Sequence, residues 1–291
     1  MASTSSRTSN SDRDAIQKAE TEHLENNAIN PWWTPGYGPL SRIPTGDSYL
    51  PAFGGAFQPG LYKPPDQRFA NPAPLGLAGF ALTTFLLSLV NLGTRGIATP
   101  NIVVGPAYAY GGLIQLLAGM WEMAVGNTFG ATALTSYGAF WIGLGIIFTP
   151  GGFEIATAYG GATPAFYTAV GFYLYGWFIF TFILWLLTLR STVAFSSLFL
   201  TVWLTFLMLA TGYMYTTTVD GVTSPNHNLN LAGGSFGIVA AFIAWWNMFA
   251  GIADRGNSFF LVPVLHFPWS EKGRQRRKEK AESIRDVEKG E

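Results

Sequence analysis

Six long apolar runs follow one another through the middle of the chain, and they constrain its fold more than any other feature. Only six residues between Ala73 and Asp254 carry a formal charge. Each run is long enough to cross a hydrocarbon core about 30 Å thick as a helix. Because a spanning segment in lipid must satisfy its own backbone hydrogen bonds, the pattern predicts an all-α polytopic membrane protein with six transmembrane helices. The runs lie near residues 73–92, 103–125, 129–150, 165–189, 193–215 and 232–253.

The composition excludes several other classes of protein. Charged residues make up 12% of the chain and hydrophobic residues 49%, whereas a soluble domain has about 25% charged residues. Seventeen Lys and Arg residues balance seventeen Asp and Glu residues, so the net charge does not favour nucleic acid as a partner. The sequence has no cysteine, no metal-ligand spacing, no phosphate-binding loop and no nucleophile elbow. We therefore expect no enzyme activity, no metal and no cofactor.

Polar segments flank the six runs and divide the chain into three parts. Residues 1–70 form a polar tail, in which the stretch 31–65, rich in Pro, Gly and aromatic residues, is either an interfacial segment or a plain linker. Residues 71–255 form the six-helix domain, and residues 256–291 form a basic C-terminal tail. An even number of spans places both ends on one side of the membrane, and that side carries most of the basic residues. Positive charge marks the cytoplasmic face, so both termini are predicted to be cytoplasmic.

The first run begins with a helix-capping sequence. Asn71 is followed by Pro72, Ala73 and Pro74. Asn is a favoured N-cap residue, and Pro fits the first turn because its missing N–H has no helical partner there. The positive end of such a helix also attracts anions. Plain capping and an anion site both remain open interpretations.

Polar and small residues recur at helical spacing within three of the runs. A helix surrounded only by lipid has no reason to carry such a stripe. The stripes therefore indicate either close helix packing or a polar path shared between helices, and we favour the path. The residues are Phe80, Thr84, Ser88 and Asn91 in the first run, Tyr108, Gly112, Gln115, Gly119 and Glu122 in the second, and Thr132, Ser136 and Tyr137 in the third.

Glu122 is the only acidic residue well inside a predicted span. Ionisable groups within a membrane are rare and usually functional, so this carboxyl group is a candidate for proton exchange. Glu122 also lies about one turn from the cytoplasmic end of its run. A structural bond to a neighbouring helix is therefore an equal alternative.

A series of motifs runs through the first three predicted helices. They are Asn71-Pro72-Ala73-Pro74-Leu75-Gly76-Leu77, Tyr110-Gly111-Gly112 with Gln115, Ala118-Gly119-Met120-Trp121-Glu122, Asn127-Thr128-Phe129-Gly130, and Thr135-Ser136-Tyr137-Gly138 followed by Phe140-Trp141. In order and spacing they resemble the acetate uptake transporter family, which contains bacterial succinate–acetate permeases and fungal acetate and ammonia-export proteins. The resemblance extends over roughly residues 69–254, and the long polar N-terminal tail is similar to the fungal branch.

This resemblance implies a homo-hexameric ring in which each protomer has its own six-helix pore. It also implies a narrow constriction inside each pore. Phe80 matches the family's constriction phenylalanine, and Tyr137 matches its constriction tyrosine. The third member is a leucine of the fifth run, for which Leu200 is the best placement and Leu198 the alternative.

Further positions match family residues associated with substrate passage. These are Asn71 and Thr83, although the helical spacing in this sequence favours the neighbouring Thr84. The candidate pore residues are therefore Asn71, Phe80, Thr83, Thr84, Gln115, Glu122, Tyr137 and Leu200.

The resemblance finally implies transport of acetate and other short-chain monocarboxylates across the plasma membrane, by a proton-coupled or channel-like mechanism. Propionate, formate and succinate are further candidate substrates. A narrow apolar gate would favour a protonated acid over an ion, because burying an unpaired charge is far more costly. Two alternatives stay open, an ammonium or ammonia exporter of the same fold and a membrane sensor or scaffold without net transport.

Overall fold

The computed structural model describes residues 69–97, 99–151, 153–263 and 265–290. The expected polar tail of residues 1–70, with its aromatic stretch 31–65, therefore lies outside the described residues except for Phe69 and Ala70. The description below concerns the remaining part of the chain.

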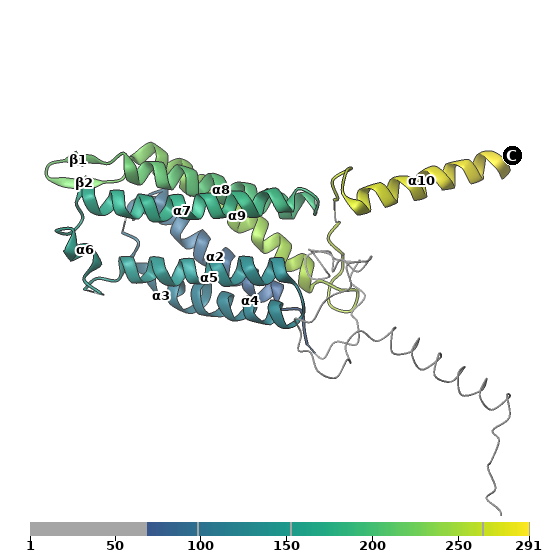
Figure 1. The fold of residues 1–291 in the computed structure, drawn as a ribbon, viewed down its shortest axis with the longest axis horizontal. Coiled ribbons are helices and arrows are strands. Elements are labelled where there is room, and N and C mark those ends of the chain that lie inside the picture. Colours follow the sequence, from purple (N-terminus) through teal and green to yellow (C-terminus); the bar gives the residue numbers. More distant parts are fainter. Residues whose placement is uncertain (1–68, 98, 152, 264, 291) are drawn as a thin grey trace, which may run out of the picture. The chain divides into compact units, whose positions relative to one another are not determined.

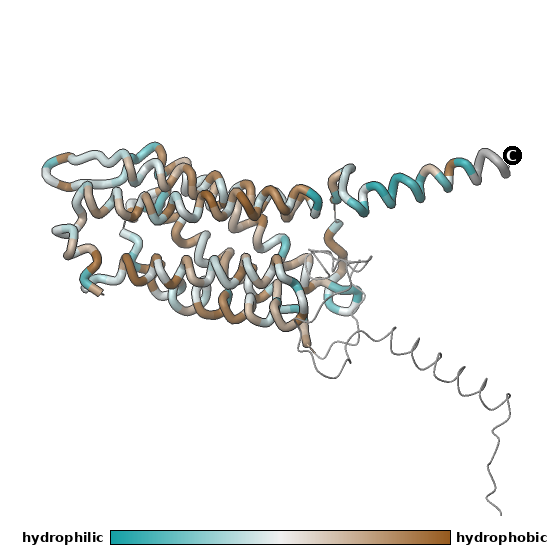
Figure 2. Tube along the Cα trace, viewed as in Figure 1, coloured by the Kyte–Doolittle hydropathy of each residue, from teal (hydrophilic) through white to brown (hydrophobic). Residues whose placement is uncertain are grey.

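Six helical spans form the membrane domain, as the hydropathy predicts (Figure 1). The second span is not one regular helix, because a π-helical segment, η2, joins its two α-helical halves. Hydrophobic residues occupy much of each span, and hydrophilic residues gather at the bundle ends and beyond (Figure 2). The spans are α2 (Ala73–Asn91), α3 (Asn101–Tyr108) with η2 (Ala109–Ile114) and α4 (Gln115–Ala124), α5 (Thr128–Phe148), α7 (Pro164–Thr188), α8 (Val193–Met214) and α9 (His227–Ile252).

Side-chain caps set the beginnings of four spans. Asn127, Thr163, Thr192 and Asn226 each accept a hydrogen bond from a backbone N–H three residues later. Asn226 explains why α9 begins at His227 rather than near residue 232, where the apolar run starts. Because this bond caps the helix, α9 also includes the polar residues before the apolar run, which hydropathy alone places outside the span.

The α2 helix lies among the other spans. It packs against α9 on one side and against the second span on the other, while α8 packs against both α7 and α9. Glycines bring these helices close together. A Cβ atom on Gly233 would meet the Leu209 side chain, and one on Gly237 would meet Ser88. The spacing of Gly233 and Gly237 thus serves close helix packing, as small residues do in membranes.

Short elements join the spans at the end of the bundle opposite the start of α2, called the hairpin end below. They are η1 (Thr94–Gly96), α6 (Ile155–Ala158), and an antiparallel pair of strands, β1 (Thr217–Val219) and β2 (Val222–Ser224). The apolar runs and motifs of the sequence did not predict this hairpin. Asp220 and Gly221 both have positive φ angles, 50° and 79°, as a tight two-residue hairpin turn requires.

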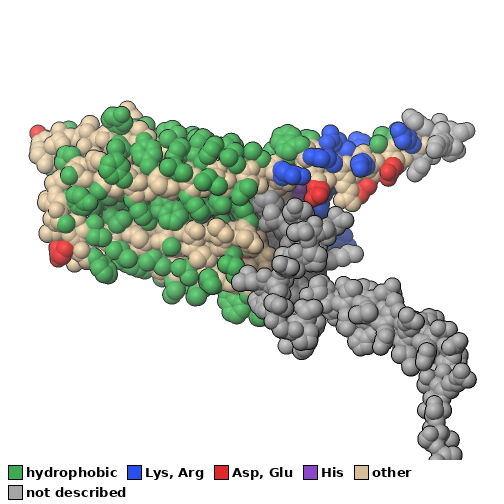
Figure 3. All heavy atoms as spheres, in the orientation of Figure 1, with side chains coloured by type: hydrophobic (Ala, Val, Ile, Leu, Met, Phe, Trp, Pro, Cys, Tyr) green, Lys and Arg blue, Asp and Glu red, His purple; other side chains and the backbone are tan. Residues whose placement is uncertain are grey.

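The other end of the bundle, called the tail end, contains the start of α2 and the end of α9. After α9 the chain returns to the α7–α8 connection, where the Trp269 indole donates to the Leu189 carbonyl at 2.8 Å. Burial and the nearby positive charges of Arg276 and Lys272 lower the pKa of His266. Helix α10 (Glu271–Gly290) follows and carries many of the basic side chains, whereas apolar side chains cover the spans (Figure 3).

Candidate pore and its constriction

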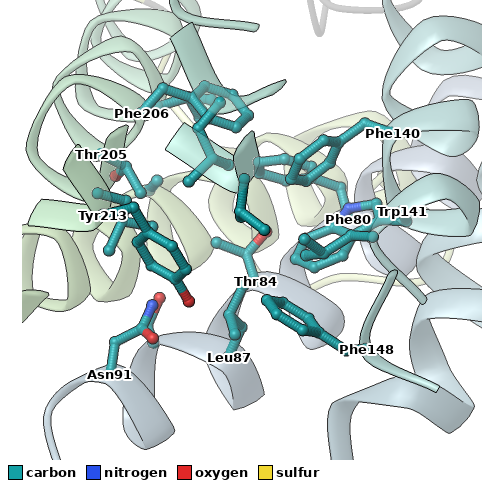
Figure 4. Close-up of a pocket in the computed structure, with 17 residues that line it drawn as sticks. Phe80, Thr84, Leu87, Asn91, Phe140, Trp141, Phe148, Thr205, Phe206 and Tyr213 are labelled. Carbon is teal, nitrogen blue, oxygen red and sulfur yellow. The ribbon is translucent and has the colours of Figure 1, made fainter. Parts of the chain in front are cut away.

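Two cavities lie in series inside the bundle. The larger one, shown in Figure 4, contains about 610 Å³ of space not filled by protein atoms, and the smaller one about 380 Å³. Each is large enough to hold at least one water molecule. Phe80 and Val202 line both cavities, so the boundary between them lies at these two side chains.

The two cavities extend toward opposite ends of the bundle. The larger one reaches Asn91, the last residue of α2, and Tyr213, close to the end of α8. The smaller one includes Leu77 and Phe195, which lie near the beginnings of the same two helices. A path from the hairpin end to the tail end would therefore cross both cavities and the boundary at Phe80.

Two aromatic rings meet at this boundary. The ring centroids of Phe80 on α2 and Tyr137 on α5 lie 6.0 Å apart, and both side chains are buried. The Tyr137 hydroxyl and the Thr181 hydroxyl on α7 share a hydrogen bond of 2.9 Å, and the ring packs against Phe199 on α8. These contacts from three helices hold the tyrosine ring in place beside Phe80.

The leucine beside these rings is Leu198 rather than Leu200. Leu198 is 3% exposed and lines the smaller cavity together with Phe80 and Tyr137, whereas Leu200 lines neither cavity. Two residues along an α-helix correspond to a rotation of about 200°, so the two leucines lie on nearly opposite faces. Of the two leucines considered from the sequence, Leu198 is therefore the one that lines a cavity beside Phe80 and Tyr137.

Of the two adjacent threonines, only Thr84 faces a cavity. Its hydroxyl is buried in the wall of the larger cavity and has no hydrogen-bond partner among the described residues (Figure 4). Thr83 is fully buried elsewhere, donates to the Gly79 carbonyl at 2.9 Å and packs where Gly111 leaves room. The indole N–H of Trp141, in the same cavity wall as Thr84, likewise has no partner within the described ranges.

Gln115 is the polar member of the second span that reaches a cavity. Its side chain is 0% exposed and lines the smaller cavity beside Phe80 and Tyr137. The preceding η2 segment sets its direction, since the Gln115 backbone N–H donates to Tyr110, five residues earlier. Such π-helical segments change the register of side chains and occur frequently at functional sites.

The three polar stripes of the sequence face different surroundings in the structure. All four residues of the first stripe, Phe80, Thr84, Ser88 and Asn91, line the larger cavity. In the second stripe Gly112 and Gly119 instead allow close contact with Ile142 and Thr135 of α5. In the third stripe Thr132 is exposed on the bundle surface, so the stripe as a whole does not face the path.

Asn71 and Glu122 line neither cavity and lie at the tail end. The Asn71 side chain accepts from the Ala73 N–H at 3.1 Å, so it bonds the first turn of α2, although Pro72 holds the N-cap position. Glu122 is fully buried and accepts from the Asn127 amide, whose oxygen accepts from the first turn of α5. Glu122 thus ties the end of α4 to the start of α5.

Several cavity residues were not singled out from the sequence. The signal was present on α8, where cavity residues recur every three or four positions, but most of them are apolar and resemble ordinary core. On α5 the cavity residues Phe140 and Trp141 were noted only as part of a motif. The cavity residues of α8 are Phe195, Leu198, Phe199, Val202, Thr205, Phe206, Leu209 and Tyr213, of which only Leu198 was named from the sequence.

Comparisons with known proteins find relatives over most of the chain. Residues 53–269 match the profile of the GPR1/FUN34/yaaH family. Acetate permease A of Emericella nidulans is 60% identical over 246 residues, which cover 83% of this chain and 82% of the permease. Ammonia transport outward protein 2 of Saccharomyces cerevisiae is 49% identical over 226 residues, 78% of this chain and 77% of that protein. The solved bacterial acetate channel SatP matches with a TM-score of 0.56 and 31% identity, covering 68% of this chain and 99% of the channel.

Proposed function

Because the chain belongs to the GPR1/FUN34/yaaH family, we propose that it transports acetate and other short-chain monocarboxylates across a membrane. The observation that carries this proposal is the Phe80–Tyr137 pair, which narrows the path between two cavities of one six-helix domain. Similarity to a permease and to a channel, both named for acetate, supports the substrate. We propose a transporter rather than an enzyme on the same grounds.

The chemistry of the narrow point favours a small neutral molecule. The smaller cavity is lined mainly by aliphatic and aromatic side chains, and its described lining includes no Lys, Arg or His that would pair with a carboxylate. Moving an unpaired carboxylate into such surroundings is very unfavourable, whereas the protonated acid carries no net charge. An apolar constriction with a few polar groups is sufficient for selectivity of this kind. Transport is therefore proposed to be coupled to protons.

The remaining candidate residues have roles outside the cavities. The Asn71 side-chain oxygen bonds the start of α2 at the tail end, where the positive end of the helix would attract acetate before it enters the path. Glu122 is proposed to hold α4 and α5 together at the same end. Thr83 would act by packing α2 against η2, which keeps Phe80 at the boundary.

The assembly and location are proposed with the function. We place the protein in the plasma membrane with both termini in the cytoplasm, since the basic residues concentrate at the tail end and in α10. We also propose a homo-hexamer with one pore per protomer. Cross-linking in native membranes would test the number of protomers.

The test of the main proposal is uptake of labelled acetate by proteoliposomes that contain the full-length protein. Uptake would be measured with and without an inward proton gradient, with protein-free liposomes as the control for leak. Accumulation that depends on the gradient and is inhibited by unlabelled propionate supports a proton-coupled carrier. Flux that only equilibrates acetate supports a channel, and no flux above the leak contradicts acetate transport.

The second candidate function is export of ammonia, which the similarity to ammonia transport outward protein 2 favours. Methylammonium serves as the discriminating competitor in the same proteoliposomes. Inhibition of acetate uptake by propionate but not by methylammonium supports the monocarboxylate. Flux of methylammonium without flux of acetate supports ammonia export, and binding of acetate without any flux supports a sensor.

A further inference from the structure

The amide of Gln115 is buried without the hydrogen bonds that a buried amide normally makes. The side chain is 0% exposed, and neither its oxygen nor its nitrogen has a hydrogen-bond partner in the described part of the chain. Most buried polar atoms in folded proteins are paired, so an unpaired amide needs a specific explanation. Its position in the wall of the smaller cavity indicates that the missing partner is a molecule inside that cavity.

The surroundings of Gln115 restrict what that partner is. Apart from Gln115 and Tyr137, the described lining of the smaller cavity consists of Leu77, Phe80, Ala133, Leu134, Phe195, Leu198, Phe199 and Val202. The Tyr137 hydroxyl is already bonded to Thr181. The Gln115 amide is therefore the polar group of this wall that has both a donor and an acceptor available.

A primary amide presents a donor and an acceptor on the same edge. A protonated carboxylic acid presents the complementary acceptor and donor, so the two groups can form a planar ring with two hydrogen bonds. A carboxylate offers acceptors only, which leaves the amide oxygen unpaired and places a charge in an apolar cavity. Ammonium offers donors only, which leaves the amide N–H groups unpaired and likewise places a charge in an apolar cavity.

We propose that Gln115 binds the protonated form of the transported acid through this two-bonded ring, beside the Phe80–Tyr137 constriction, so that the proton crosses the narrow point on the substrate. The inference rests on the proposed acetate transport and deepens it. It assigns coupling to the substrate's own proton rather than to a titrating side chain of the protein. No bond is made or broken beyond the hydrogen bonds.

Two isomeric competitors test the pairing in the unmodified protein. Propionamide and N-methylacetamide are neutral and contain the same atoms, but only propionamide has an N–H on the same edge as its carbonyl in the stable trans amide. Each would be added to proteoliposomes during uptake of labelled acetate. We expect propionamide to inhibit uptake at least about tenfold more strongly, since the two-bonded ring is available to it alone.

Substitution of the amide provides a second test. Gln115→Met has a similar length and makes no comparable hydrogen bonds, so we expect the KM for acetate to rise about 10- to 100-fold and the preference for propionamide to vanish. Thr135→Val is the matched control. The Thr135 hydroxyl is also buried without a partner among the described residues, but it lines neither cavity, and its removal should leave the KM unchanged.

The outcomes separate this inference from the proposed function. Equal inhibition by the two isomers overturns the pairing even if acetate uptake is normal, and so does an unchanged KM in Gln115→Met. Because the competitor experiment uses the unmodified chain, it decides the question even if Gln115→Met fails to fold. Absence of acetate uptake by the unmodified chain overturns the proposed function and this inference with it.

Discussion

Removal of the Phe80 ring tests the constriction most directly. The ring lines both cavities and forms the boundary between them. In Phe80→Ala the two cavities become continuous, and Tyr137 loses the ring that lies 6.0 Å from its own. The narrow point then depends on Tyr137 and Leu198 alone, so the variant should accept longer acids.

Phe80→Ala should lower both the folding stability and the discrimination against longer acids. A Phe→Ala change in a packed core costs about 3–5 kcal/mol of folding stability. Phe80 borders empty space on both sides, so we expect a loss near the lower limit, about 3 kcal/mol. In the unmodified pore, each methylene beyond what fits should cost about 1–3 kcal/mol. That corresponds to roughly 5- to 150-fold discrimination against a longer acid, most of which should disappear in Phe80→Ala.

The assay compares uptake of labelled acetate and butyrate in proteoliposomes, as the ratio of kcat/KM for the two acids. Phe85→Ala is the matched control, because Phe85 lies on the same helix and packs against Phe242 and Trp245 away from both cavities. The control should lose stability and keep the selectivity. A folded Phe80→Ala protein with the unmodified acetate-to-butyrate ratio would refute the constriction.

The remaining predictions concern the lining of the smaller cavity, Glu122 at the tail end and the packing of the helices. Leu198→Ala should increase uptake of butyrate relative to acetate severalfold, while Leu200→Ala should not. An effect of Leu200→Ala alone would show that Leu200, and not Leu198, belongs to the constriction. Glu122→Gln keeps an oxygen that accepts from Asn127, so the pH dependence of acetate uptake should not change; a shifted profile would show that the carboxyl group takes part in proton transfer. Gly79→Ala would place a Cβ atom 2.5 Å from the Tyr110 backbone oxygen and should lower stability by at least about 1–3 kcal/mol, as measured by thermal unfolding in detergent. Gly176→Ala, where a Cβ atom meets nothing within 4 Å, should leave the protein as stable or slightly more stable.

Hydropathy and short motifs are sufficient to locate the membrane domain along the chain. The predicted span 73–92 is α2 to within one residue, and the predicted span 193–215 is α8 to within one residue. Sequence succeeds here because each spanning helix must satisfy its own backbone and bury its own apolar length, whatever its neighbours are. The family resemblance, carried by the motifs, is confirmed for the same stretch of chain.

The direction of each side chain was decided only by the tertiary structure. Leu198 and Leu200 are equally apolar, and Thr83 and Thr84 have the same chemistry, so composition does not distinguish the members of either pair. Their neighbours do, because the rotation of each helix is fixed by what it packs against, and one residue changes the direction by about 100°. The direction of the Gln115 side chain depends further on η2, because the hydrogen bond from the Gln115 N–H to the Tyr110 carbonyl, five residues earlier, changes the helical register. The sequence therefore determined which segments cross the membrane, and packing determined which of their side chains meet along one path.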